Sequence, residues 1–168
     1  RLAAKTQWTV NLGMLGRLEV VYVDAMRLDK GNFLKPDIGS SRPLLTTSMG
    51  RALLLASSAQ EQKSILNRLK IADPVQYKKD LPHFYRDQEF YERNGYCLSR
   101  GDWEADVSAV AVPLRVGSND DPLVALNCTM SGLKLTQAEI SKQVIPSLLE
   151  AKRNIERDGG TSYLSRKN

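Results

Sequence analysis

The stretch LVALNCTMSG, residues 123–132, constrains the fold more than any other part of the chain, because its side chains alternate strictly in character. One parity is large and apolar, and the other is short, with polar groups but no charges. A strand that faces water usually carries charges on its polar side, so this short uncharged side favours the wall of a cavity. The apolar parity comprises Val124, Leu126, Cys128 and Met130, and the short parity comprises Ala125, Asn127, Thr129 and Ser131.

Further strand patterns occur in both halves of the chain. Alternation over residues 107–114 predicts a second strand of the same kind. Residues 8–26 predict a hairpin that turns near Leu15, and a short strand is expected near residues 33–34. The chain therefore contains enough strands for a sheet of its own.

Four segments carry helical patterns, most of them with recognisable caps. Thr136 and Glu139 have the spacing of a capping box, Pro82 suits the first turn of a helix, and Gly95 suits the position after a last turn. The order of strands, helices, strands and a last helix indicates an α+β domain with an antiparallel sheet. The four segments are residues 47–56, 58–70, 81–94 and 136–155.

The length of 168 residues fits one domain with one substantial core. The net charge of +5 arises from thirteen Lys and Arg against seven Asp and Glu in residues 1–84, and eleven against twelve in residues 85–168. The basic residues are dispersed, which favours a solvated surface over a nucleic-acid interface.

No signal peptide or membrane-spanning apolar run occurs. We therefore expect a soluble cytoplasmic protein, and its start at Arg1 suggests a fragment of a longer chain.

Few residues point to catalysis. Cys97 and Cys128 lack C-x-x-C spacing, so we expect two buried apolar side chains and no disulfide. His83 is the single histidine, which excludes a two-histidine metal site, and no nucleophile motif accompanies it. The carboxylates of GDWEAD, residues 101–106, could act as acid and base, but such groups are common in loops. We expect no cofactor.

The stretch GSSRPLLTTSMGRALLLAS, residues 39–57, suggests a site for a small anion. Hydroxyl residues 46–48 precede a helix, whose first turn offers free N–H groups and a favourable dipole. Arg42 adds a planar fork of donors suited to a carboxylate. The short polar side of residues 127–132 could complete the site. The alternative is a capped helix, a polar strand face and a surface arginine that pairs with Asp37 or a neighbouring subunit.

Six motifs in this order and spacing resemble the effector-binding domain of IclR-type bacterial transcriptional regulators. They are LGRLEVVYVD, IGSSRPLLTTSMGRALLLAS, ERNGY, VSAVAVPL, DPLVALNCTMSG and LTQAEI. The resemblance extends from Thr9 to Ile155 and implies a GAF-like curved antiparallel sheet with helices packed on it. It also implies a pocket for a small effector and an upstream winged helix-turn-helix domain, absent from this chain, that binds DNA.

The resemblance further implies which residues line the effector pocket. Members that bind small oxo-acids carry an aspartate in place of Ser99, a cysteine in place of Ala109 and an apolar residue in place of Arg42. This pocket should therefore prefer anions. Trp103 is expected either to pack in the core or a loop, or to close over the ligand. The implied residues are Leu34, Arg42, Ser48, Met49, Ser99, Ala109, Thr129 and Ser131.

The resemblance also implies which partners and which domain boundaries to expect. The partners are a small organic acid effector, further copies of the chain in a dimer or tetramer, and DNA only through the missing domain, with no membrane. We expect residues 1–8 to end an interdomain linker, 9–157 to form the effector-binding domain and 158–168 to form a flexible tail. A small enzyme that acts on an anionic metabolite through His83 or the GDWEAD carboxylates remains the alternative function.

Overall fold

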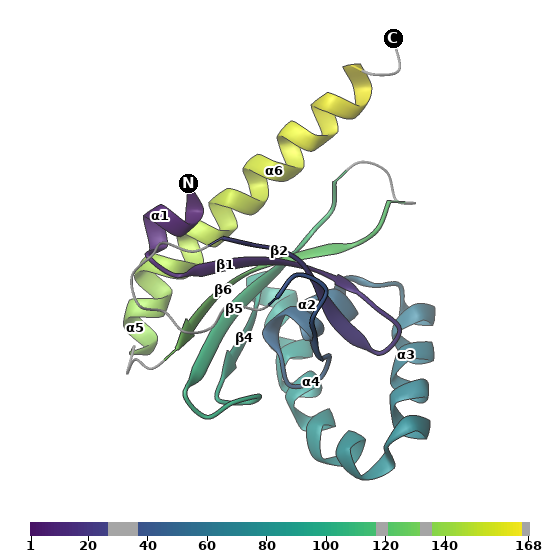
Figure 1. Cartoon of the computed structure of the whole chain (residues 1–168). Helices are drawn as coiled ribbons and strands as arrows, with labels where there is room; N and C mark the ends of the chain where they lie inside the picture. The colour runs from purple at the N-terminus through teal and green to yellow at the C-terminus, as the bar shows by residue number, and fades with distance from the viewer. Residues whose placement is uncertain (27–36, 117–120, 132–135, 166–168) are drawn as a thin grey trace.

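The computed structural model describes residues 1–26, 37–116, 121–131 and 136–165, with side chains through residue 159. One antiparallel sheet of six strands crosses its middle in the order β3-β2-β1-β6-β5-β4 (Figure 1). The hairpin and both alternating strands are confirmed, whereas the strand predicted near residues 33–34 lies outside the described residues. The strands are β1 (Thr9–Leu15), β2 (Glu19–Met26), β3 (Ser41–Pro43), β4 (Cys97–Arg100), β5 (Val107–Leu114) and β6 (Val124–Ser131).

Helices cover both faces of this sheet, as expected for an α+β fold (Figure 1). One face packs against α2, α3 and α4, and the other packs against α1 and the C-terminal helix. None of the described helices is long and apolar enough to cross a membrane. The helices are α1 (Leu2–Thr6), α2 (Ser48–Ala56), α3 (Ala59–Ala72), α4 (Pro74–Asn94), α5 (Gln137–Glu139), the π-helical η1 (Ile140–Val144) and α6 (Ile145–Ser165).

The alternation along the strands divides the interior into two cores, one on each face of the sheet. Toward α2, Ala111 and Ala125 pack with Leu53. Toward α6, Val112 packs with Leu148. A one-residue change of register would exchange these faces, so the alternation specifies how the strands pair.

The two cysteines lie one in each core, free and buried, as the sequence predicts. Burial raises the pKa of the Cys97 thiol well above its ordinary value and that of Cys128 to about 12. Both thiols therefore stay protonated near neutral pH and behave as small apolar groups.

The start predicted for the third helix at Leu81 is wrong, because α4 begins at Pro74. Asp73 caps it by accepting the N–H of Gln76, and a proline at the first helical position is pre-organised for the helix. Pro82 thus lies inside a helix of 21 residues. Packing of the buried face of α4 against α2 and β4 compensates for the hydrogen bond that an interior proline removes.

The other predicted helix starts are confirmed by their caps. Thr47, Ser58 and Thr136 each accept the backbone N–H three residues further on. Gly95 ends α4 with a φ of 74°, which glycine adopts without strain.

Strands β3 and β4 are not predicted by the sequence pattern, because their three and four residues are too short to show a period. The pattern also gives no sign of the π-helical turn before Pro146, where the helix accommodates a residue without an N–H. The sequence predicts a flexible tail over residues 158–168, whereas helix α6 continues to Ser165. The domain limits stay a prediction.

Candidate functional site

A row of small and polar side chains crosses the sheet on the side of α2. The strand register places Thr129 beside both Thr9 and Ala109, and Ala109 beside Ser99. The hydroxyl of Ser99 donates to the carbonyl oxygen of Thr46 at 3.3 Å, so the row ends beneath the start of α2. The structure thus brings three of the candidate residues together on one face.

Two buried asparagines form the next row of this face. Nδ2 of Asn11 donates to Oδ1 of Asn127 at 2.8 Å and to the hydroxyl of Thr129 at 3.1 Å. Asn127 lies on the short polar parity of its strand but is not among the predicted site residues, and neither is Asn11. The alternation of the first hairpin strand was the signal that could have found Asn11.

Six buried side-chain atoms on this face and on the segment that leads into α2 have no hydrogen-bond partner within the described part of the chain. Such an atom costs about 1–3 kcal/mol, and native proteins hold few of them. Their concentration on this face makes it the candidate binding site for a polar ligand, which could form the missing hydrogen bonds. The atoms are Oγ1 of Thr9, Oδ1 of Asn11, Oγ of Ser40, Nε of Arg42, Oγ1 of Thr46 and Oγ of Ser48.

The first turn of α2 adds free backbone donors. Thr47 accepts the N–H of Gly50 at 3.1 Å, but no described group accepts the N–H of Ser48 or Met49. The segment before the helix folds back closely onto it, since a Cβ on Gly50 would lie 2.3 Å from the carbonyl oxygen of Leu44. The positive end of the helix dipole therefore lies at the polar face, with two N–H groups that bind no other group of the described residues.

Arg42 lies between two aromatic rings. Its Cζ is 4.8 Å from the ring centroid of Trp103 and 5.7 Å from that of Tyr22, both within cation–π range. Nη1 donates to the carbonyl oxygen of Ser41, and among the described residues Arg42 forms no ion pair, so the alternative pairing with Asp37 is absent. Burial raises the pKa of Tyr22, and the charge of Arg42 opposes that rise.

A buried ion network holds the loop that carries Trp103. The side chain of Arg51 is fully buried, and its Nε and Nη2 donate to Asp87 at 2.6 Å and to Asp102 at 2.9 Å. Arg86 donates to the same oxygen of Asp102 at 2.6 Å. Because Asp102 directly precedes Trp103, the network fixes the β4–β5 loop, residues 101–106, to α2 and α4. This network is not among the sequence predictions, although the charged Arg51 inside the apolar stretch MGRALLLA was a signal for it.

Two of the residues considered for catalysis, Asp102 and His83, belong to this network, whereas Glu104 and Asp106 are exposed in the same loop. Burial alone would raise the pKa of Asp102, but the hydrogen bond from Arg86 and the charges of Arg51 and Arg86 together lower it. Nδ1 of His83 lies 3.4 Å from Asp102. No hydrogen bond or ion pair joins either residue to Arg42 within the described residues. In that same part of the chain, no His, Cys, Asp and Glu side chains gather into a set of three that could hold a metal ion.

The remaining candidates occupy different places. Leu34 lies outside the described residues. Met49 is buried in the core, where a Cβ on Gly13 of β1 would lie 2.3 Å from its sulfur. Ser131 pairs with Val107 at the end of β6, next to the polar row.

Comparison with known proteins identifies a family. A family model described as bacterial transcriptional regulator IclR C-terminal matches residues 1–157. The chain is 31% identical over 117 residues to the HTH-type transcriptional regulator TsaQ1/TsaQ2 of Comamonas testosteroni, a match that covers 66% of this chain and 41% of that protein. The chain spans between 40% and 56% of the length of the curated relatives that it matches.

Solved structures agree with the fold. A crystal structure of an IclR family transcriptional regulator from Brucella abortus superimposes with a TM-score of 0.83 at 31% identity, over 94% of this chain and 59% of that one. The inducer-binding domain of the transcription factor PobR from Acinetobacter, a double mutant in complex with 3-hydroxybenzoic acid, superimposes with a TM-score of 0.71 at 23% identity. That match covers 92% of this chain and 91% of the other, and at this identity it shows the fold alone.

Proposed function

The chain belongs to the family of bacterial transcriptional regulator IclR C-terminal domains, and on that premise we propose that it senses a small organic carboxylate at the polar face beneath the start of α2. One observation carries the proposal, namely the six buried polar atoms around this face that find no hydrogen-bond partner among the described residues. A ligand that forms hydrogen bonds with these atoms offsets the cost of having buried them away from water.

The donors of the site suit a carboxylate. The guanidinium of Arg42 can donate to one carboxylate oxygen or to both. The N–H groups of Ser48 and Met49 can also donate to the carboxylate, at the N-terminus of α2. Trp103 covers Arg42 and would lie along a planar ligand body. Oδ1 of Asn11 accepts hydrogen bonds only, so it favours a ligand with a hydroxyl group away from the carboxylate.

The Acinetobacter neighbour supports the same ligand class. That protein is described in complex with 3-hydroxybenzoic acid, a planar carboxylate with one hydroxyl group. We therefore infer an aromatic hydroxycarboxylate as the first class to test for this chain.

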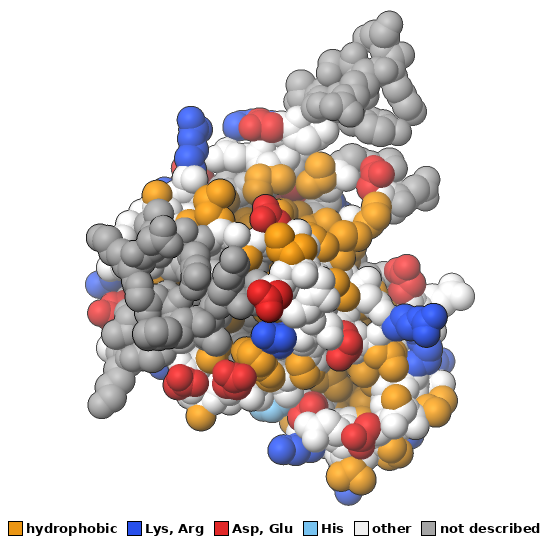
Figure 2. All heavy atoms as spheres, in the orientation of Figure 1, with side chains coloured by type: hydrophobic (Ala, Val, Ile, Leu, Met, Phe, Trp, Pro, Cys, Tyr) orange, Lys and Arg blue, Asp and Glu red, His pale blue; other side chains and the backbone are white. Residues whose placement is uncertain are grey.

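The curated relatives are named as transcriptional regulators or activators. We propose that this chain catalyses no reaction and that sequence-specific DNA binding belongs to a domain outside it, in a regulator that works in the bacterial cytoplasm. The ion network supports the absence of catalysis, because Asp102, the carboxylate that lies 3.4 Å from His83, is already bound by Arg51 and Arg86. Figure 2 supports the assignment of DNA binding to another domain, since acidic and basic side chains are interspersed on the face shown.

A thermal-shift screen tests the sensing function. A ligand at about a hundred times its Kd stabilises the folded state by roughly 2.7 kcal/mol, which raises the Tm by about 5–10 °C for a domain of this size. We expect 3-hydroxybenzoate or a related carboxylate to produce such a shift, and 3-hydroxybenzyl alcohol to serve as the matched neutral control. A screen in which no carboxylate exceeds its neutral analogue contradicts the proposal.

Trp103 should report the ligand directly. Because its ring stacks on Arg42, a carboxylate that binds this guanidinium changes the environment of the indole. In a chain with Trp8→Phe, which leaves Trp103 as the single tryptophan, the emission should shift as the ligand saturates. An unchanged spectrum at saturation would remove Trp103 from the site.

We also expect self-association as a dimer or tetramer. Ile71, Val75 and Tyr85 expose large apolar surfaces on α3 and α4, which supports burial against another copy. Sedimentation at roughly 50 µM, above the Kd of a specific interface of standard size, should show a mass above that of the monomer. A monomer under these conditions contradicts the expectation.

A further inference from the structure

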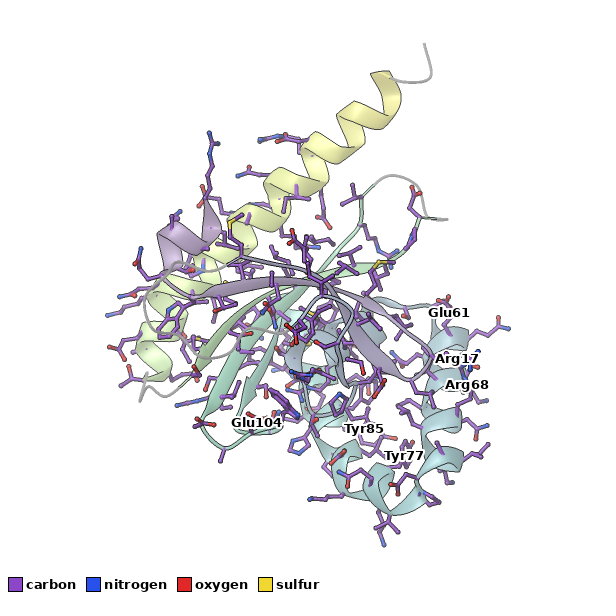
Figure 3. All side chains as sticks on the ribbon, in the orientation of Figure 1. Arg17, Glu61, Arg68, Tyr77, Tyr85 and Glu104 are labelled. Carbon is purple, nitrogen blue, oxygen red and sulfur yellow. The ribbon has the colours of Figure 1, made fainter. Side chains whose placement is uncertain are left out.

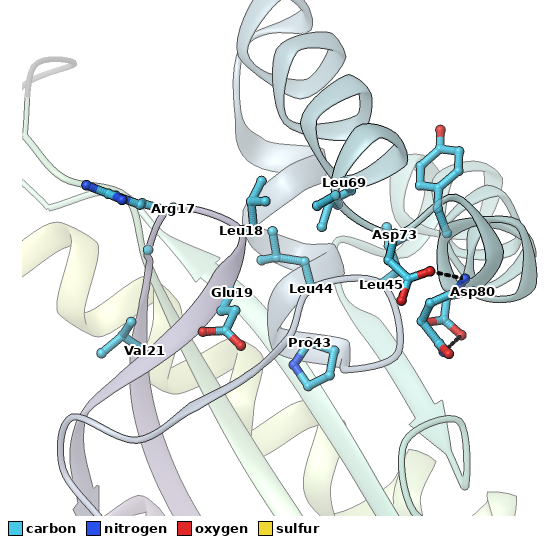
Figure 4. Close-up of a pocket in the computed structure, with 14 residues that line it drawn as sticks. Arg17, Leu18, Glu19, Val21, Pro43, Leu44, Leu45, Leu69, Asp73 and Asp80 are labelled. Atoms are coloured by element: carbon cyan, nitrogen blue, oxygen red, sulfur yellow. Dashed lines mark hydrogen bonds between the residues drawn. The ribbon is translucent and has the colours of Figure 1, made fainter.

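A groove lies on the other side of the segment that precedes α2, away from the polar face. It has a volume of about 380 Å³, between the β1–β2 turn on one side and α3 and α4 on the other (Figure 4). Leu18, Leu44, Leu45 and Leu69 line its apolar part. The groove contains none of the six unpaired atoms of the proposed effector site, so it is a separate feature of the molecule.

Asp80 of α4 lines this groove as a buried carboxylate. The residue is 6% exposed, and both of its oxygens accept from the single amide nitrogen of Gln76, at 2.9 and 2.8 Å. Asp80 forms no ion pair within residues 1–26, 37–116, 121–131 and 136–165. A carboxylate has about four acceptor positions, and a buried one without a compensating charge is costly.

The groove has two further carboxylates, Glu19 and Asp73, which also form no ion pair within the described residues, but both are exposed, so Asp80 is its one buried charge among those residues. Glu19 accepts from the hydroxyl of Ser41, and Asp73 caps α4 through the N–H of Gln76. Arg17 stands at the turn, and in Figure 4 its side chain extends away from the other lining residues. The wall is therefore acidic in a protein of net charge +5.

We propose that this groove binds a small organic cation, an alkylammonium or arylalkylammonium ion. The ammonium group pairs with the carboxylate of Asp80, and Tyr77, one turn earlier on α4, offers its ring to the same charge. The apolar part of the ligand lies over Leu44 and Leu69. Figure 3 labels Tyr77 on α4 and Arg17 at the β1–β2 turn, and these two elements form opposite sides of the groove. The volume suits a ligand of fragment size.

Calorimetric titration with 2-phenylethylamine tests this assignment, with 2-phenylethanol as the neutral isostere and phenylacetate as the anion. The amine should bind at least tenfold more tightly than either analogue, as expected for one charge-assisted hydrogen bond in a partly buried site. Asp80→Asn should remove most of this preference, because the amide keeps the shape but not the charge. Asp106→Asn, an exposed aspartate of the β4–β5 loop, is the matched control and should leave the affinity unchanged.

Two further variants keep the test independent of folding and of the effector site. Ala72→Trp, at an exposed position on the edge of the groove, should weaken amine binding about tenfold by filling it. Arg42→Ala should not change amine binding, because Arg42 does not line the groove. The amine result therefore does not depend on whether the carboxylate proposal is correct. Equal binding of amine and alcohol, or unchanged amine binding by Asp80→Asn, overturns the proposal. A smaller sedimenting mass for Asp80→Asn also overturns it, because the cation would then be a lysine or arginine of a second copy.

Discussion

Replacing Arg51 with alanine is expected to lower the free energy of unfolding by about 3–5 kcal/mol, the largest stability effect that we expect of a single substitution. The buried guanidinium donates to Asp87, to Asp102 and to two backbone carbonyl oxygens. Alanine leaves both carboxylates largely buried, and among the described residues Arg86 is the one arginine that still pairs with them. Chemical denaturation of the two proteins under identical conditions measures the difference.

Two further variants test whether the loss of stability in Arg51→Ala comes from the ion network. Arg68→Ala removes an exposed arginine of α3 and should change stability by less than about 0.5 kcal/mol. Arg51→Lys should recover only a small part of the loss, because an ammonium group lacks the fork that reaches two carboxylates at once. If Arg51→Ala and Arg68→Ala cost the same, the ion network does not stabilise the fold.

Replacing Arg42 with alanine is expected to weaken binding of the carboxylate effector by about one to two decades. A hydrogen bond to a charged group contributes roughly 1.5–3 kcal/mol, and each decade of affinity corresponds to about 1.4 kcal/mol. The rings of Trp103 and Tyr22 already hold the guanidinium in place, so little side-chain freedom is lost when the ligand binds. Calorimetric titration with the carboxylate that the thermal-shift screen selects measures the change.

The controls for Arg42 separate charge from packing. Arg42→Lys should restore part of the affinity, since the charge remains but the planar fork does not. Arg68→Ala should bind the effector as the unmodified chain does. Unchanged affinity in a folded Arg42→Ala variant would mean that the arginine only packs between the two rings.

Local patterns in the sequence predicted most of the fold. Alternation of side chains specified β1, β2, β5 and β6, because a strand has a period of two whatever its neighbours are. Hydroxyl caps located the starts of α2 and α3, since a cap acts within a single turn. The start of α4 was misplaced because Pro74 and Pro82 both suit a first turn, and the buried packing of α4 decides between them.

The sequence by itself thus determined which side chains share a face, including the short polar parity that carries Asn127 and Thr129. Only the tertiary structure decided which charges and rings meet. Arg51 lies 36 positions from Asp87 and 51 from Asp102, and their contact depends on how α2, α4 and the β4–β5 loop pack. Arg42 could have paired with nearby Asp37, but it stacks on Trp103. Long-range contacts of this kind have no period along the chain, because they depend on the packing of complete elements.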